Sequence, residues 1–109
     1  MNVNWTGYSG KVYSMELCEL GRAFATNPGV YVFCRPAPRG TWGPIYVGET
    51  EDFDDCLHVN LATHSCWDCI MLRERATNVC CLVVHGGKVV RTAIETDLRV
   101  ALDPPCNRQ

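Results

Sequence analysis

Two short runs, GVYVFCR at residues 29–35 and IYVGE at residues 45–49, are the clearest structural signal in this chain. Both combine β-branched, aromatic and other apolar residues, which is typical of strands. Residues 36–44 between them are rich in proline and glycine, which marks a connection. We therefore predict an antiparallel β-hairpin in which Tyr31 and Tyr46 can face each other.

The segments on either side of this hairpin extend the prediction to an α+β fold. The patterns indicate a strand at residues 11–15, helices at 53–61 and 65–73, a strand at 77–84 and a last helix ending before Pro104. Ser65 would start the second helix as its N-cap. This order predicts a small, mostly antiparallel three-stranded sheet flanked by helices, with an extra N-terminal strand. We expect residues 1–27 to form an N-terminal extension packed on a domain of residues 28–109.

Length and charge limit the class of protein. The chain has 109 residues, which suits one domain, and a formal net charge of −2. Its first residues lack the basic and apolar regions of a secretory signal, and it contains no apolar run long enough to span a membrane. We therefore expect a cytoplasmic protein without a membrane partner. The acidic balance does not favour strong sequence-independent binding to nucleic acid, which depends on lysine and arginine.

The chain contains eight cysteines, a large number for its length. Cys34 and the pair Cys80-Cys81 lie within apolar runs, where cysteine behaves as a small buried hydrophobe. We therefore expect mostly reduced, metal-free cysteines, with a disulfide framework and a metal site as the alternatives. The candidate zinc ligands are His64, Cys66 and Cys69, with Cys80 or Cys81 as the fourth.

The strand pair, a later glutamate and an asparagine near the end of the chain together resemble the GIY-YIG nuclease family. The resemblance rests on Gly29-Val30-Tyr31, Ile45-Tyr46-Val47-Gly48, Glu95 and Asn107, and covers roughly residues 28–107. It implies a three-stranded sheet flanked by helices. It also implies a metal-dependent endonuclease, a hydrolase that cleaves nucleic-acid phosphodiester bonds, DNA in preference to RNA.

The resemblance assigns a role to each matching residue. Tyr31 would activate the attacking water, and Tyr46 would support the phosphate. Gly48 would permit close approach to the substrate, and Glu95 would hold one Mg²⁺ or Mn²⁺. Asn107 would tie the end of the chain to the site.

One departure from the family concerns the phosphate-binding cation. Where the family carries a catalytic arginine, this chain has Cys56, a mostly neutral thiol. Asn60 also replaces a tyrosine or histidine that the family often has. His58 is a further candidate catalytic side chain if it turns inward, and Arg91 and Arg99 could each stand beside Glu95 on a helix.

Simpler interpretations remain open for the same residues. Tyr31 and Tyr46 could be ordinary strand aromatics. Glu95 could form a capping box with Thr92, and Asn107 could be a turn residue. The sequence therefore supports two hypotheses: a nuclease with weakened or lost activity, and a noncatalytic GIY-YIG-like binding or interaction module that acts through a protein partner or an oligomer.

Overall fold

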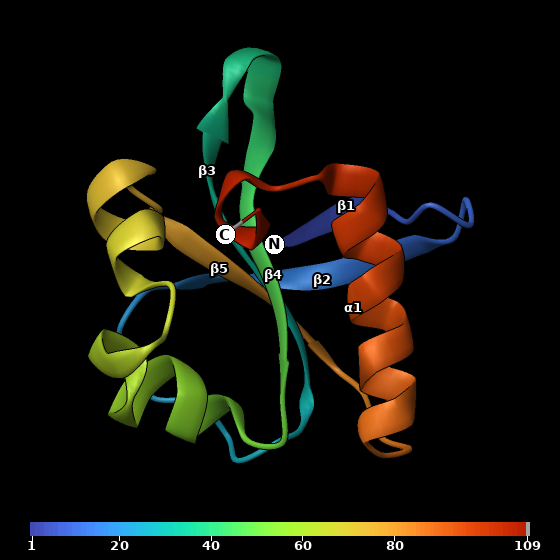
Figure 1. Ribbon diagram of the computed structural model, residues 1–109, viewed down its shortest axis with the longest axis vertical. Helices are drawn as coiled ribbons and strands as arrows, with labels where there is room; N and C mark the ends of the chain where they lie inside the picture. Colours follow the sequence, from blue (N-terminus) through green and yellow to red (C-terminus); the bar gives the residue numbers. More distant parts are fainter. Residues whose placement is uncertain (109) are drawn as a thin grey trace.

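The computed structural model describes residues 1–108 and contains one five-stranded antiparallel sheet and one long helix (Figure 1). The strand order across the sheet is β1-β2-β5-β3-β4. The regular elements are β1 (Asn2–Thr6), β2 (Val12–Glu19), β3 (Gly29–Ala37), η1 (Pro38–Gly40), β4 (Thr41–Thr50), η2 (Asp55–Val59), η3 (Leu61–Thr63), η4 (Asp68–Arg73), β5 (Asn78–Val83), α1 (Lys88–Leu102) and η5 (Pro105–Asn107). Within the described residues, no helix is long and apolar enough to cross a membrane.

The predicted hairpin is confirmed as β3 and β4, with Tyr31 opposite Gly48 and Phe33 opposite Tyr46. β3 also pairs with β5 on its other side, and its residues from Gly29 to Cys34 are all buried. A strand covered on both faces needs a continuous apolar run, because it has no solvent-facing side. The composition of β3 therefore follows from its central place in the sheet.

Each face of the sheet carries its own hydrophobic core. Helix α1 packs on one face, where Leu98 is fully buried together with Val30 and Val32 of β3. The helical segment between β4 and β5 covers the opposite face, where Tyr31 and Phe33 are buried (Figure 1). Alternate residues of β3 thus serve different cores, as the pleat of a strand requires.

The expected three-stranded sheet is one part of the observed five-stranded sheet. Residues 2–19 form a hairpin of two strands, and β2 pairs with β5 with Glu16 opposite Cys81. The extra strand predicted at residues 11–15 is confirmed within β2, whereas β1 was not predicted. Trp5 is the one buried residue of β1, so the strand shows little alternation of buried and exposed side chains.

The two predicted helices before β5 are shorter and wider than expected. The amide of Asn60 donates to the carbonyl of Asp55, five residues back, which defines a π turn in place of an α-helix that continues to Leu61. The second segment is also π-helical, and Ser65 does not cap it, because its N-cap is Trp67 and no side chain bonds there. Both segments still bury apolar residues, Leu57 and Ile70 among them, in the core beneath the tyrosines.

The chain after α1 crosses to the free edge of the sheet. The helix ends at Leu102, followed by Asp103 in the left-handed conformation (φ 44°) and by a proline that prevents continuation. The last turn, η5, then packs against β4, the edge strand (Figure 1). The end of the described chain therefore lies beside the strand that carries Tyr46.

Candidate functional site

Tyr31 and Tyr46 face the same side of the sheet from neighbouring strands. Their ring centroids are 6.2 Å apart and their planes are inclined by 30°, so the rings are stacked. Tyr31 is only 3% exposed, and Tyr46 is partly exposed. Burial is the first cause that raises the pKa of both phenols, in Tyr46 to about 12 and in Tyr31 further. Both hydroxyls are therefore protonated at neutral pH.

Gly48 is required by the position of Tyr31. A Cβ atom added at Gly48 would overlap Cζ and Oη of the Tyr31 ring. The close approach that the sequence assigned to this glycine is therefore an approach of the Tyr31 side chain to the backbone of β4. Any larger residue at this position would displace the ring.

His64 completes the cluster, and sequence reasoning considered it only as a zinc ligand. Its Nε2 lies 2.9 Å from the hydroxyl oxygen of Tyr31, and its ring meets the Tyr46 ring edge-on at a centroid distance of 5.0 Å. The contact with Tyr31 spans 33 positions of sequence. Nothing in the local pattern around His64 signals it, because its position depends on how η3 and η4 fold over the sheet.

The hydrogen bonds of His64 assign its proton. The backbone amide of Cys66 donates to Nδ1 over 3.0 Å, and an amide N–H can only donate. The neutral ring must therefore carry its proton on Nε2 and donate it to the Tyr31 oxygen. Burial lowers the pKa of His64, which is consistent with a neutral ring. His64 is thus a hydrogen-bond donor that favours negative charge on Tyr31.

This environment of His64 predicts a pH dependence of stability. The folded state keeps the ring neutral, whereas the unfolded chain binds a proton near the ordinary pKa of 6.5. The unfolded state therefore takes up more protons as the pH falls, and stability decreases below that value. We expect the melting temperature of the parent to fall more than that of His64→Gln between about pH 7.5 and about pH 5.5. Equal slopes in the two proteins would contradict a neutral, buried His64.

Cys56, which replaced an arginine in the resemblance drawn from the sequence, points at the same hydroxyl. Its thiol donates to the Tyr31 oxygen over 3.6 Å. Burial raises the pKa of Cys56, so the group is uncharged at neutral pH. The Tyr31 oxygen therefore faces two hydrogen-bond donors, His64 and Cys56, and no formal positive charge from either.

His58 does not turn toward the tyrosines, contrary to the possibility raised from the sequence. Its side chain is largely exposed, and its Nδ1 lies 3.0 Å from a carboxylate oxygen of Asp54, four residues earlier. The ring therefore occupies the outer face of its helical segment. As a candidate catalytic side chain, His58 is not brought into the cluster, whereas His64 is.

Glu95 lies on α1 close enough for its charge to act on both tyrosines. Its negative charge contributes to the raised pKa of Tyr31 and of Tyr46. Burial raises the pKa of Glu95 itself, and the nearby Glu49 adds to this, while Arg99 opposes it. The helix starts at Lys88 with a glycine as its N-cap, so the proposed capping box with Thr92 is wrong. Glu95 therefore has no role in starting the helix.

Arg91 and Arg99, the two arginines considered as replacements for the missing cation, lie in different surroundings. Arg91 is only 4% exposed and donates from Nε to a carboxylate oxygen of Glu49 over 2.9 Å. This pairing neutralises Glu49 on the α1 face of the sheet. Arg99 is exposed on the outer part of the helix and acts on Glu95 through its charge. Arg91 is thus committed to Glu49.

Asn107 bonds directly to the strand that carries Tyr46. Its side-chain amide donates to the carbonyl of Val47 over 2.9 Å and accepts from the amide of Val47 over 2.8 Å. Because β4 is the edge strand, these two backbone groups would otherwise be open to solvent. The side chain acts as a short substitute for a further strand. Asn107 therefore attaches the end of the described chain to β4 through two hydrogen bonds.

The cysteines are partly as expected. Cys34 and Cys80 are fully buried among apolar side chains, as predicted. Cys69 and Cys106, however, form a disulfide with a Cα–Cα distance of 5.7 Å, so the expectation of reduced thiols fails for this pair. Cys69 is therefore excluded as a zinc ligand in this state. No group of three or more potential metal ligands occurs among residues 1–108.

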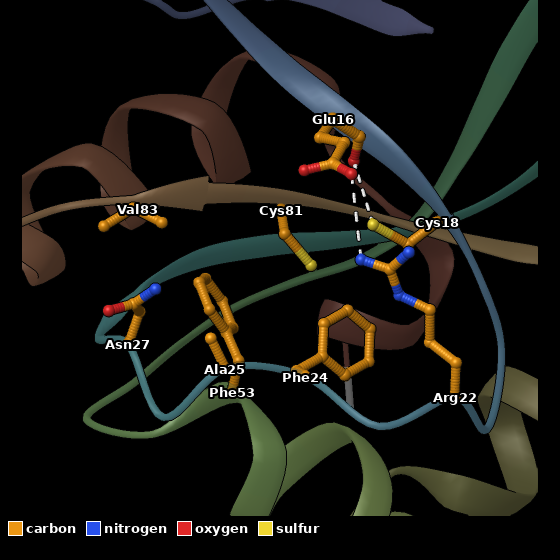
Figure 2. Close-up of a pocket in the computed structure, with 9 residues that line it drawn as sticks. All are labelled: Glu16, Cys18, Arg22, Phe24, Ala25, Asn27, Phe53, Cys81 and Val83. Atoms are coloured by element: carbon orange, nitrogen blue, oxygen red, sulfur yellow. Dashed lines mark hydrogen bonds and ion pairs between the residues drawn. The ribbon is translucent and has the colours of Figure 1, made fainter.

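A cavity of about 110 Å³ opens on the same face of the sheet, beside the tyrosine cluster. Figure 2 shows Phe24 and Phe53 on one side of it and the thiols of Cys18 and Cys81 on the other. The guanidinium of Arg22 lies 4.8 Å from the centre of the Phe24 ring and pairs with Glu16 at the rim. In the β3–β5 register, Cys81 lies opposite Tyr31, so the cavity and the cluster are adjacent. No local sequence pattern predicts this cavity, because its lining comes from four separate segments.

No protein-family model, curated protein or solved structure matches this chain. Function is therefore inferred from the contacts described above and from the residues of the chain that carry the resemblance. Those residues, spread over three elements and the last turn, gather around one edge of the sheet.

Proposed function

We propose that this chain is a GIY-YIG-type endonuclease domain with weakened activity, which hydrolyses nucleic-acid phosphodiester bonds, DNA in preference to RNA. The observation that carries the proposal is the setting of Tyr31, whose ring lies over Gly48 and stacks with Tyr46, and whose hydroxyl receives a hydrogen bond from His64. Any buried tyrosine hydroxyl needs a hydrogen-bond partner, but three side chains with shifted pKa values in contact, Tyr31, Tyr46 and His64, are typical of a functional site.

The residues around Tyr31 fit the orientation of a water or a phosphate oxygen. Burial raises the pKa of Tyr31 most and Cys56 adds to this rise, whereas the hydrogen bond from His64 favours electron density on the Tyr31 oxygen. The hydroxyl proton of Tyr31 is then available to a third group. Asn107 holds the Val47 backbone, and with it the adjacent Tyr46, in a fixed position.

Glu95 is the residue that would hold a divalent ion. A single carboxylate suits Mg²⁺ or Mn²⁺, because such ions keep much of their hydration shell. Burial is the first cause of the raised pKa of Glu95, and a bound cation would offset the cost of holding its charge there. The chemistry supplied by the bound ion is neutralisation of charge on the phosphoryl oxygens.

Cys56 explains why we propose weakened activity. The uncharged thiol supplies no positive charge to the phosphoryl group, where a permanently charged arginine fork would. Loss of such a cation lowers the rate by about 10³-fold or more. We therefore expect slow, metal-dependent cleavage by the parent chain.

The second candidate function is a noncatalytic binding module, and the cavity in Figure 2 favours it. Its aromatic wall, with Arg22 and Glu16 at the rim, suits one side chain of a partner protein, because about 110 Å³ is below the usual volume of a small-molecule pocket. Such a module would need the fold but neither the metal nor the Tyr31 hydroxyl. Metal binding therefore separates the two functions.

The test is Mn²⁺ binding and DNA cleavage by Glu95→Gln. We expect the parent to bind one Mn²⁺ weakly, and Glu95→Gln to lose affinity by at least about tenfold, because the single carboxylate is removed. The matched control is Glu51→Gln, whose side chain is 86% exposed. Water-proton relaxation measures the binding, and a nicked or branched DNA substrate measures cleavage. Unchanged Mn²⁺ binding in Glu95→Gln would contradict the proposed metal site.

A further inference from the structure

A free cysteine lies three positions before one partner of the disulfide. Cys66 and Cys69 form a Cys-Trp-Asp-Cys sequence, and Cys69 is bonded to Cys106. Cys66 is a free thiol. The chain therefore holds three cysteines that can exchange one disulfide bond, and one of them, Cys66, lies beside Tyr46 and His64.

The backbone brings Cys66 and Cys69 to the same side of one helical turn. The amide of Ile70 donates to the carbonyl of Cys66 over 2.9 Å, so the chain turns helically through these positions. Residues three apart on such a turn are neighbours. Cys66, Cys69 and Cys106 also pack in the same hydrophobic core.

The three thiol positions differ in access to solvent. Cys69 is 3% exposed and Cys106 is 1% exposed, so an external reductant has little direct access to their disulfide. Cys66 is partly exposed. Thiol–disulfide exchange requires a thiolate to reach a sulfur atom of the disulfide, and Cys66 is a thiol of the same chain that can do so.

We propose that Cys66, Cys69 and Cys106 form a thiol–disulfide exchange centre in which Cys66 is the entry thiol. This goes beyond the proposed nuclease function and does not depend on it. The substrate class is a dithiol, which reduces the centre, or its disulfide, which oxidises it. Without Cys66, neither the dithiol nor its disulfide would react readily with the buried cysteines Cys69 and Cys106.

The exchange is balanced at each step. Cys66 loses its proton to solvent, and its thiolate attacks Sγ of Cys69. A Cys66–Cys69 bond forms while the Cys69–Cys106 bond breaks, and Cys106 leaves as a thiolate that takes up a proton. This step transfers no net electrons. A dithiol then attacks Sγ of Cys66 and closes into its own disulfide, which passes two electrons and leaves Cys66 and Cys69 as thiols.

The exchange also affects the edge of the sheet. Cys106 precedes Asn107, whose side chain covers the backbone of Val47. Breaking the bond to Cys106 removes the covalent tie between this last turn and η4. The Val47 amide should then exchange its hydrogen faster, because its partner is held by hydrogen bonds alone.

The test compares the reduction of the oxidised parent and of Cys66→Ser by dithiothreitol, a dithiol. Samples are quenched with N-ethylmaleimide, and mass spectrometry of peptides follows the appearance of the Cys106 thiol. We expect this rate to fall by at least about tenfold in Cys66→Ser. The control is Cys81→Ser, which removes another partly exposed free thiol and should leave the rate unchanged.

A second measurement detects the rearranged bond itself. In mildly alkaline buffer without reductant, a fraction of the parent should carry a Cys66–Cys69 disulfide and an alkylated Cys106. Cys66→Ala is tested beside Cys66→Ser, and the melting temperature of each variant is measured. A variant that does not fold is then identified, and the other variant still tests the proposal. Reduction of both folded variants at the parent rate, with no Cys66–Cys69 species in the parent, would overturn the proposal.

Discussion

Cys56→Arg is expected to raise Mg²⁺-dependent DNA cleavage by about 10³-fold, because it restores a permanent positive charge beside the Tyr31 hydroxyl. The Cys56 thiol already points at that oxygen from 3.6 Å, so the replacement side chain starts from the right position. The longer side chain would place a guanidinium beside this hydroxyl and the partly exposed Tyr46. Initial rates on nicked, branched and single-stranded DNA measure the gain.

The controls distinguish the effect of positive charge from that of side-chain size, and a loss of folding from a loss of catalysis. Cys56→Met adds length without charge and should not raise cleavage. Tyr31→Phe or Glu95→Gln, added to Cys56→Arg, should each remove the gain, because the hydroxyl and the carboxylate act separately. A guanidinium trapped in the core would destabilise the fold, so melting temperatures accompany each assay. A folded Cys56→Arg variant that cleaves neither DNA nor RNA would favour the binding module.

The β3–β4 hairpin, β5 and α1 were predictable from the sequence because each depends on its own periodicity or composition. The apolar runs of β3 and β5 are long enough to be recognised as strands, and Pro104 marks the end of the helical region. β1 was missed because five residues with one fully buried side chain give little signal. The π turns were missed because helical spacing does not distinguish bonds to the fourth residue from bonds to the fifth.

The candidate site was predictable only as far as the resemblance reached. Tyr31 and Tyr46 were predicted to face each other, and their rings do stack, because both lie on one hairpin whose register follows from its strands. His64 and the Cys69–Cys106 disulfide depend on how distant segments meet. Such contacts cannot be read from local spacing, and His58 was considered in place of His64 for that reason.

Gly48→Ala is expected to destabilise the protein by about 1–3 kcal/mol, because the new methyl group would overlap the end of the Tyr31 ring. The matched control is Gly43→Ala in the same strand, where the nearest side-chain or backbone atoms lie 3.7 and 3.9 Å from the added Cβ. That variant should differ from the parent by no more than about 0.5 kcal/mol. Denaturant unfolding measures all three proteins.

The cause of the destabilisation can be isolated with a double-mutant cycle. Tyr31→Leu shortens the side chain and removes the atoms that the methyl group would meet, so Gly48→Ala should cost less in that background by about 1–2 kcal/mol. If Gly48→Ala lowers the free energy of unfolding equally in both backgrounds, Gly48 is needed for the conformation of β4 and not for the position of the Tyr31 ring. A positive coupling would tie this glycine to Tyr31. The requirement for glycine at position 48 would then follow from where the Tyr31 hydroxyl must lie, beside His64 and Cys56.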